Sequence, residues 1–179
     1  MSGARTFKFL AAGARGPVSG FQWPAPGTWV ETSSVIEPCV RGAHLCRVID
    51  LPYWLHDELW ELEHAGEQVE GIDCLVVQRA RLVRRFAGWQ ADGARQFLAA
   101  CAQHAAETAA QAAPEARARA QGYVDDAEEC VAAHVIAFGA FSAAVAVGKL
   151  AAEADAVRAY RNERAWQADW LFRCVIGGN

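Results

Sequence analysis

Alanine is distributed very unevenly along this chain, and this distribution is what most constrains its fold. Residues 1–90 contain 9 alanines, whereas residues 91–179 contain 29. Alanine has the highest helix propensity and a minimal side chain, so alanine-rich helices form readily and can approach one another closely. The first half instead holds five of the seven tryptophans and five of the six prolines, a composition typical of strands and irregular turns. The sequence therefore predicts an α+β fold, with a small, mostly antiparallel sheet in residues 1–90 packed against a helical bundle in residues 91–179 as one integrated domain.

Apolar residues in the first half follow the period of two that is typical of half-buried strands. This pattern predicts strands over Leu59–His64 and Cys74–Phe86. Turns at Pro26-Gly27 and at Gly42 predict two shorter strands after them, over Thr28–Thr32 and Ala43–Arg47. Asp50 precedes an apolar segment that contains a proline, so we expect it to be the N-cap of a short helix.

From Asp92 onwards the period becomes 3.6, which indicates amphipathic helices. The first should end before Pro114 and a second should begin at Glu115. We expect Gly122 to separate the second helix from a third, and a last helix to begin near Glu153.

Charge and targeting signals restrict the classes of protein to which this chain can belong. The net charge is −4 and the isoelectric point is near 5.7, which argues against a nucleic-acid-binding protein. The first residues lack the apolar segment of a secretion signal, so we interpret the six cysteines as free thiols of a cytoplasmic protein. Residues 131–148 carry no charge, and we interpret them as a buried helix and not as a membrane span.

The pattern Cys39-x4-His44-x-Cys46 is the first candidate site. Two thiolates and an imidazole could bind zinc with one position open for catalysis. His44 and Cys46 would point to the same side of a strand, so they could instead be a base and a nucleophile. The structural alternative is a buried cysteine behind a glycine turn, with the histidine hydrogen-bonded to the backbone.

Two Cys/His pairs in the helical half form a second metal-site hypothesis. Cys101 and His104 share one helix face, as do Cys130 and His134. Neighbouring helices could bring the four side chains together as zinc ligands. The alternative is that both pairs lie where two helices cross through small residues, with each histidine bonded locally.

Aromatic side chains are unusually dense in the first half, and could line an apolar ligand pocket or form the core of the sheet. We expect Trp23, Trp29 and Trp54 to contact a ligand, with Tyr53 and His56 beside them.

Arginines occupy alternating positions of the last predicted strand. Arg79 and Arg81 could bind the anionic group of a substrate. They could equally form ion pairs with Glu61 and Glu63 of a neighbouring strand, which the balance of charge in residues 1–90 favours.

Several stretches of residues 6–90 form a recognisable set. They are Thr6-Phe-Lys-Phe-Leu, Gly20-Phe-Gln-Trp-Pro, Cys39-x-x-Gly-x-His-x-Cys-Arg, Asp50-Leu-Pro-Tyr-Trp-Leu, Glu58-Leu-Trp-Glu-Leu-Glu and Arg79-Ala-Arg-Leu-Val-Arg-Arg. Together they resemble an uncharacterised family of high-GC actinobacterial proteins, a resemblance that implies no catalytic residues. The helical half, which contains Glu163-Arg-Ala-Trp-Gln, is loosely similar to helical modules of immunity proteins.

These observations predict a protein that binds a small molecule between the sheet and the helices. An enzyme of this kind would be a cofactor-independent isomerase, cyclase or lyase, because the chain has no glycine-rich phosphate loop, dinucleotide fingerprint or serine elbow. His44 would be the acid or base, Cys46 a nucleophile or a neighbouring group, and Tyr53 or His56 a second proton donor. The alternatives are a non-catalytic interaction or immunity-type protein, and a metal-dependent protein that uses the Cys/His ligands.

Overall fold

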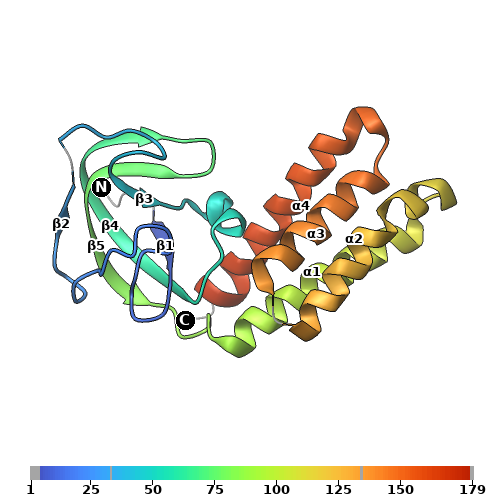
Figure 1. Cartoon of the computed structure of the whole chain (residues 1–179), viewed down its shortest axis with the longest axis horizontal. Helices are drawn as coiled ribbons and strands as arrows, with labels where there is room; N and C mark the ends of the chain where they lie inside the picture. Colours follow the sequence, from blue (N-terminus) through green and yellow to red (C-terminus); the bar gives the residue numbers. More distant parts are fainter. Residues whose placement is uncertain (1–4, 33, 134, 178–179) are drawn as a thin grey trace. The chain divides into compact units, whose positions relative to one another are not determined.

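The computed structural model of this chain describes residues 5–32, 34–133 and 135–177 (Figure 1). The chain divides into two compact units, which we call the sheet unit (residues 1–90 and 175–179) and the helical unit (residues 91–174). Strands occur in the first and α-helices in the second. The fold is therefore α+β, which confirms the prediction made from the alanine distribution.

An antiparallel sheet of five strands forms the sheet unit as far as the structure describes it. The strands are β1 Thr6–Leu10, β2 Val30–Glu31, β3 Ala43–Leu45, β4 Glu58–Glu70 and β5 Leu75–Arg85. Their order is β1-β4-β5-β2, and β3 pairs with a different part of β5. Figure 1 shows β4 and β5 as a long curved hairpin. The four predicted strands are confirmed, although β2 is limited to Val30–Glu31, and β1 is added at the edge.

The central strand β5 separates an apolar core from a charged face. Its Leu82 lies opposite Leu62 of β4, and both side chains are buried. On the other face, Arg81 forms an ion pair with Glu63 at 2.5 Å and Arg84 with Glu61 at 2.7 Å. These pairs confirm the cross-strand use of the arginines that the charge balance favours.

The start of the helix after β3 differs from the prediction. Asp50 is not an N-cap, because a 3₁₀ helix, η1, spans Val48–Tyr53 and contains it. The buried Asp50 carboxylate instead reaches back to Arg47, accepting hydrogen bonds from its backbone N–H and its Nε at 2.8 Å. Arg47, three residues earlier in the chain, thus provides the partner that an N-cap residue would find in the following turn.

Helices make up the second unit. They are α1 Ala91–Gln111, α2 Pro114–Ala133, α3 Ile136–Leu150 and α4 Ala156–Leu171, with the short helix η2 Glu153–Asp155. The short helix η3, Phe172–Ile176, begins in this unit and ends in the sheet unit. Buried alanines line the contacts between α1, α2 and α3. At Gly139 of α3, any side chain would collide with Leu98 of α1 and Cys130 of α2. Small residues therefore permit close approach of these helices, as the composition predicts.

The predicted helix boundary at Gly122 is wrong. Gly122 is exposed inside α2, and the break comes instead between Ala133 and Ile136. A single exposed glycine costs a helix about 1 kcal/mol, which the surrounding alanines offset. The uncharged stretch 131–148 is divided by this break, and within the described residues no helix is long and apolar enough to cross a membrane.

Candidate functional site

A cavity of about 600 Å³ lies in the sheet unit. Its walls come from β1, from the loop that follows β1, from β2, and from β3 with the turn before it. Most of the lining is apolar and includes Phe9, Phe21, Trp23 and Trp54. All the lining residues lie between positions 8 and 74, so the helical unit contributes none of them. A concave, mostly apolar volume of this size with a few polar groups is typical of a small-molecule site.

Lys8 of β1 brings an amine to the cavity wall. Its Nζ donates a 2.6 Å hydrogen bond to the His44 carbonyl oxygen and lies 5.9 Å from the centre of the Trp23 ring. Burial lowers the pKa of Lys8 from its ordinary value, because the charged form loses solvation. Among the described lining residues the one carboxylate is Glu31, and it pairs with Arg79 at 3.0 Å.

His44 is held by the backbone through both ring nitrogens. Its Nε2 accepts a 2.8 Å hydrogen bond from the Cys39 N–H, while its Nδ1 lies 3.2 Å from the Gly42 carbonyl oxygen. The first contact requires an unprotonated Nε2, so the proton belongs on Nδ1. Burial and the nearby Lys8 charge both lower the pKa of His44, which agrees with a neutral ring. This is the backbone-bonded arrangement that the sequence left open as the alternative to catalysis.

Three cysteines, Cys39, Cys46 and Cys74, line the same cavity. Burial raises the pKa of the Cys46 thiol to about 12, and it also raises the pKa of the buried Cys74 thiol. A thiol with such a pKa is protonated at neutral pH and is a weak nucleophile. Cys46 therefore contributes a small apolar surface to the cavity.

The other predicted catalytic residues lie away from the cavity lining. Tyr53 is 39% exposed at the end of η1. The His56 Nδ1 accepts a 2.9 Å hydrogen bond from the Asp57 N–H and the His56 carbonyl oxygen accepts one from Trp89 Nε1 at 2.6 Å. The structure thus brings His44 and Cys46 to one cavity and places Tyr53 and His56 elsewhere.

The predicted binding residues divide in the same way. Trp23 and Trp54 line the cavity, and the Trp54 Nε1 donates to the Asp73 carbonyl oxygen at 2.7 Å. Trp29 is instead covered by the guanidinium groups of Arg79 and Arg81, which lie 4.5 and 4.8 Å from its ring centre. These cation–π contacts and their carboxylate partners account for both arginines on the surface of the sheet.

Neither set of predicted metal ligands forms a cluster where the structure can be followed. Across residues 5–32, 34–133 and 135–177, no three His, Cys, Asp or Glu side chains are placed to hold a metal ion. In the first set, the Cys39 N–H occupies the His44 Nε2. In the second, the His104 Nδ1 lies 2.8 Å from a Glu163 oxygen, Cys101 and Cys130 are buried, and His134 falls outside the described residues.

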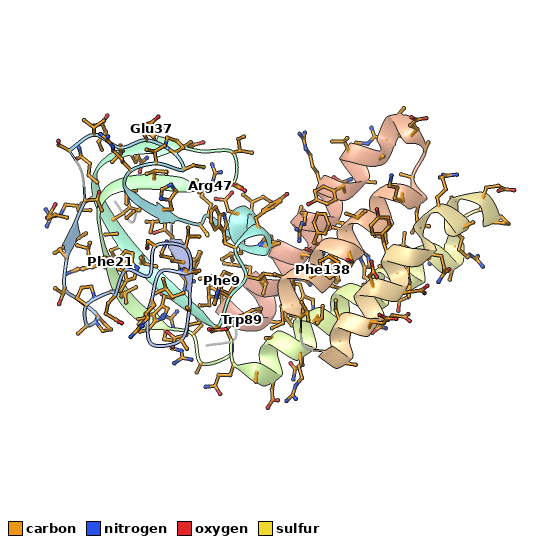
Figure 2. The ribbon with its side chains drawn as sticks, viewed as in Figure 1. Phe9, Phe21, Glu37, Arg47, Trp89 and Phe138 are labelled. Carbon is orange, nitrogen blue, oxygen red and sulfur yellow. The ribbon has the colours of Figure 1, made fainter. Side chains whose placement is uncertain are left out.

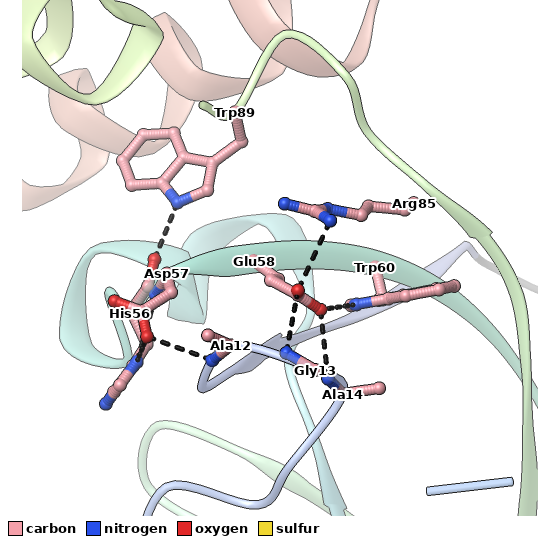
Figure 3. A network of polar contacts seen from close by, with 9 residues as sticks. All are labelled: Ala12, Gly13, Ala14, His56, Asp57, Glu58, Trp60, Arg85 and Trp89. Carbon is pink, nitrogen blue, oxygen red and sulfur yellow. Dashed lines mark hydrogen bonds and ion pairs between the residues drawn. The ribbon is translucent and has the colours of Figure 1, made fainter. Parts of the chain in front are cut away.

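A carboxylate that the sequence did not single out fixes one wall of the cavity. Glu58, at the start of β4, is 5% exposed and accepts hydrogen bonds from Gly13 N–H, Ala14 N–H and Trp60 Nε1 at 2.9–3.2 Å (Figure 3). Arg85 adds an ion pair at 3.2 Å. Burial would raise the pKa of Glu58, but these donors outweigh it and the pKa is lowered.

The turn that Glu58 holds leads directly into the cavity wall. Gly13 and Ala14 both have positive φ, and the chain then forms a short hairpin in which Trp23 N–H donates to the Ala14 carbonyl oxygen at 3.0 Å. The hairpin carries Trp23 and Phe21, whose rings meet edge to face with centres 5.8 Å apart. Glu58 is therefore a positioning residue for this wall.

An aromatic contact in the sheet unit holds β1 against the residues that follow β5. Phe9 of β1 and Trp89 lie against each other with ring centres 5.1 Å apart (Figure 2). Phe9 and Trp89 are both almost fully buried, and Phe9 also contributes to the cavity lining. One face of β1 is thus fixed by the core of the sheet unit.

The helical unit has a buried polar cluster of its own. Glu163 of α4 is 2% exposed and pairs with His104, whose ring stacks on Trp166 at 4.1 Å. Arg164 donates to Gln167 Oε1, and Gln167 Nε2 donates to the Ala140 carbonyl oxygen, each at 2.9 Å. Burial raises the pKa of Glu163, although His104 opposes this shift. The contacts link α1, α3 and α4 and account for the cluster as a structural network.

Comparisons of this chain with models of protein families, with curated proteins and with solved structures found no match. The family resemblance of residues 6–90 therefore stays a prediction.

Proposed function

We propose that this chain is a small-molecule-binding protein whose ligand occupies the cavity of the sheet unit. The observation that carries this proposal is the cavity itself, whose volume of about 600 Å³ lies in the range of ordinary ligand sites. Its aromatic walls offer apolar contact area, and Lys8 offers one polar contact. The ligand is accordingly a mostly apolar molecule of modest size.

Binding is favoured over acid–base catalysis by the state of the two polar groups expected to react. The His44 lone pair is occupied by a backbone N–H, and the Cys46 thiol is protonated at neutral pH. An isomerase, cyclase or lyase at this site would need a group that is available to accept a proton. Acid–base catalysis by an isomerase, cyclase or lyase at this cavity is the alternative proposal. Loss of turnover in a His44→Ala variant that still folds would support this alternative.

The tryptophans of this chain allow a direct test of the location of the ligand. The full chain, labelled with ¹⁵N, is titrated with decan-1-ol, a neutral apolar probe, and its indole N–H signals are followed by NMR. We expect the signals of Trp23 and Trp54 to shift in a saturable manner, because these side chains line the cavity. Trp29, Trp166 and Trp170 are internal controls outside the lining, and their signals should stay in place. Absence of any saturable shift at Trp23 and Trp54 would contradict the proposal.

A further inference from the structure

We propose that Lys8 is the anion-binding residue of this cavity and that the natural ligand is an apolar monocarboxylate. This inference rests on the proposed function and names the ligand class of the same site. Lys8 lines a cavity with mainly apolar walls, and within the described part of the chain its Nζ has one hydrogen bond, to the His44 carbonyl oxygen. An ammonium group has three donors, so two remain for a bound carboxylate.

The cavity supplies no counter-charge to Lys8 from its described lining. Glu31 is engaged by Arg79, and the Cys46 and Cys74 thiols, whose pKa values are raised, are neutral at physiological pH. His44 is neutral as well, because its Nε2 accepts a backbone hydrogen bond. Burial without an anionic partner disfavours the charged form of Lys8 and lowers its pKa, and the carboxylate of a ligand beside Nζ would favour the ammonium form again.

The charge of the lining also limits the charge of the ligand. Lys8 is the single Lys or Arg among the described lining residues. One ammonium neutralises one negative charge, whereas a phosphate monoester or a nucleotide would bring two or more into an apolar cavity. An aliphatic or aromatic chain with one carboxylate matches both the apolar walls and the single cation.

The first experiment compares three probes that differ in the head group alone. Decanoate, decan-1-ol and decylamine are titrated into the full wild-type chain at pH 7.5 and low salt, with heat as the signal. We expect decanoate to bind at least about tenfold more tightly than decan-1-ol, because hydrogen bonds to charged partners are the strong ones. Decylamine should bind most weakly, since its charge repels that of Lys8.

The second experiment uses the two lysines of the chain, Lys8 and Lys149. Lys8→Met removes the ammonium at nearly constant length, and Lys149→Met makes the same change at an exposed position of the helical unit. Lys8→Met should lose most of the preference for decanoate and keep decan-1-ol binding within about threefold. Lys149→Met should match the wild type. Lys8→Arg, which keeps the charge, should retain the preference and guards against a variant that fails to fold.

The outcomes separate this inference from the proposed function. Equal affinity for decanoate and decan-1-ol in the wild type, with Trp23 and Trp54 still responding to both, would overturn the role of Lys8 and leave small-molecule binding intact. A loss of the decanoate preference in Lys149→Met and not in Lys8→Met would also overturn it. No saturable response of Trp23 and Trp54 to any of the three probes would refute the proposed function itself.

Discussion

Replacing Glu58 by glutamine should destabilise the sheet unit, because the carboxylate is surrounded by donors. One oxygen accepts from Gly13 N–H and pairs with Arg85, and the other accepts from Ala14 N–H and Trp60 Nε1. Glutamine has the same shape, but its NH₂ group faces two donors whichever way the amide is turned. The less costly orientation places the NH₂ beside Gly13 and Arg85, since the Arg85 side chain is 45% exposed and can be solvated by water.

The magnitude follows from the contacts that this orientation loses. A hydrogen bond to a charged acceptor contributes about 1.5–3 kcal/mol, and an exposed ion pair contributes about 0–1 kcal/mol. Loss of the Gly13 bond and the Arg85 pair, with weaker bonds to the neutral oxygen, gives a decrease of roughly 3 kcal/mol in the free energy of unfolding. For a unit of this size that corresponds to a fall of roughly 10–20 °C in the melting midpoint.

The assay combines thermal unfolding with amide hydrogen exchange, measured on Glu58→Gln and on Glu67→Gln as the matched control. Glu67 is exposed on the same strand, and it accepts a hydrogen bond of 3.4 Å from Gln78 Nε2. The control should stay within about 0.5 kcal/mol of the wild type. In Glu58→Gln the Gly13 amide should exchange faster because it loses its acceptor, and the Ala14 amide should exchange somewhat faster because its acceptor becomes a neutral oxygen.

Two results would refute this reasoning. The first is a Glu58→Gln variant that melts like Glu67→Gln, with unchanged exchange at Gly13 and Ala14. The second concerns pH. The pKa of Glu58 is lower in the folded chain, so its stabilisation is present above the unfolded value near 4.5 and is lost as the pH falls through the folded value. A gap between variant and wild type that does not narrow in this acidic window would contradict the assignment.

Two further predictions concern the helical unit and the turn before β3. Glu163→Gln should raise the free energy of unfolding at pH 8 by an amount on the order of 1 kcal/mol, and by less at pH 5. The reason is that burial raises the pKa of Glu163 in the folded chain, so the ionised form is penalised above that pKa. Urea unfolding followed by circular dichroism would measure this gain, and a larger gain at pH 5 than at pH 8 would contradict the prediction. Gly122→Ala should stabilise α2 by about 0.5–1 kcal/mol, because Gly122 is helical and an added Cβ would meet no other atom. Gly42→Ala should instead lower the free energy of unfolding by about 2 kcal/mol or more, because Gly42 has a φ of +116° and the added Cβ would lie 2.5 Å from Val76 Cγ1. Melting curves of the two alanine variants should therefore move in opposite directions, and a shift of the same sign in both would count against this account.

The fold class was predictable because it depends on signals that are local in the sequence. The alternation in β4 and β5 and the 3.6 period after Asp92 each act over about ten residues, and both are confirmed. The helix boundary predicted at Gly122 is wrong because it depended on the low helix propensity of one residue, which the alanines elsewhere in α2 offset. Asp50 shows the same limit, because its partner Arg47 lies before it and not after it.

The cavity was predictable only in part, because its walls come together across long separations in the sequence. Trp23, Trp54, His44 and Cys46 were expected at a site and do line one cavity. Lys8 was missed because a lysine between phenylalanines in a strand is normally read as the solvent-facing position. Lys8 lines the cavity together with residues of the hairpin 11–23 and of β3, and no short-range pattern shows that these segments lie beside β1.

The number of partners that each buried charge has is what separates structural charges from functional ones in this chain. Glu58 has hydrogen bonds from three N–H groups and an ion pair, so its charge is fully compensated by the fold. Lys8, in the same unit, has one carbonyl acceptor and no carboxylate among the described residues of its cavity. A charge that the fold compensates completely gains little from a ligand, whereas an incompletely compensated cation such as Lys8 attracts any anion that can reach it.

If this distinction is correct, Glu58→Gln lowers stability more than Lys8→Met does, while Lys8→Met lowers carboxylate affinity more than Glu58→Gln does. Measuring both quantities on both variants would show whether the two roles are separate, and a single variant that dominates both losses would show that they are not.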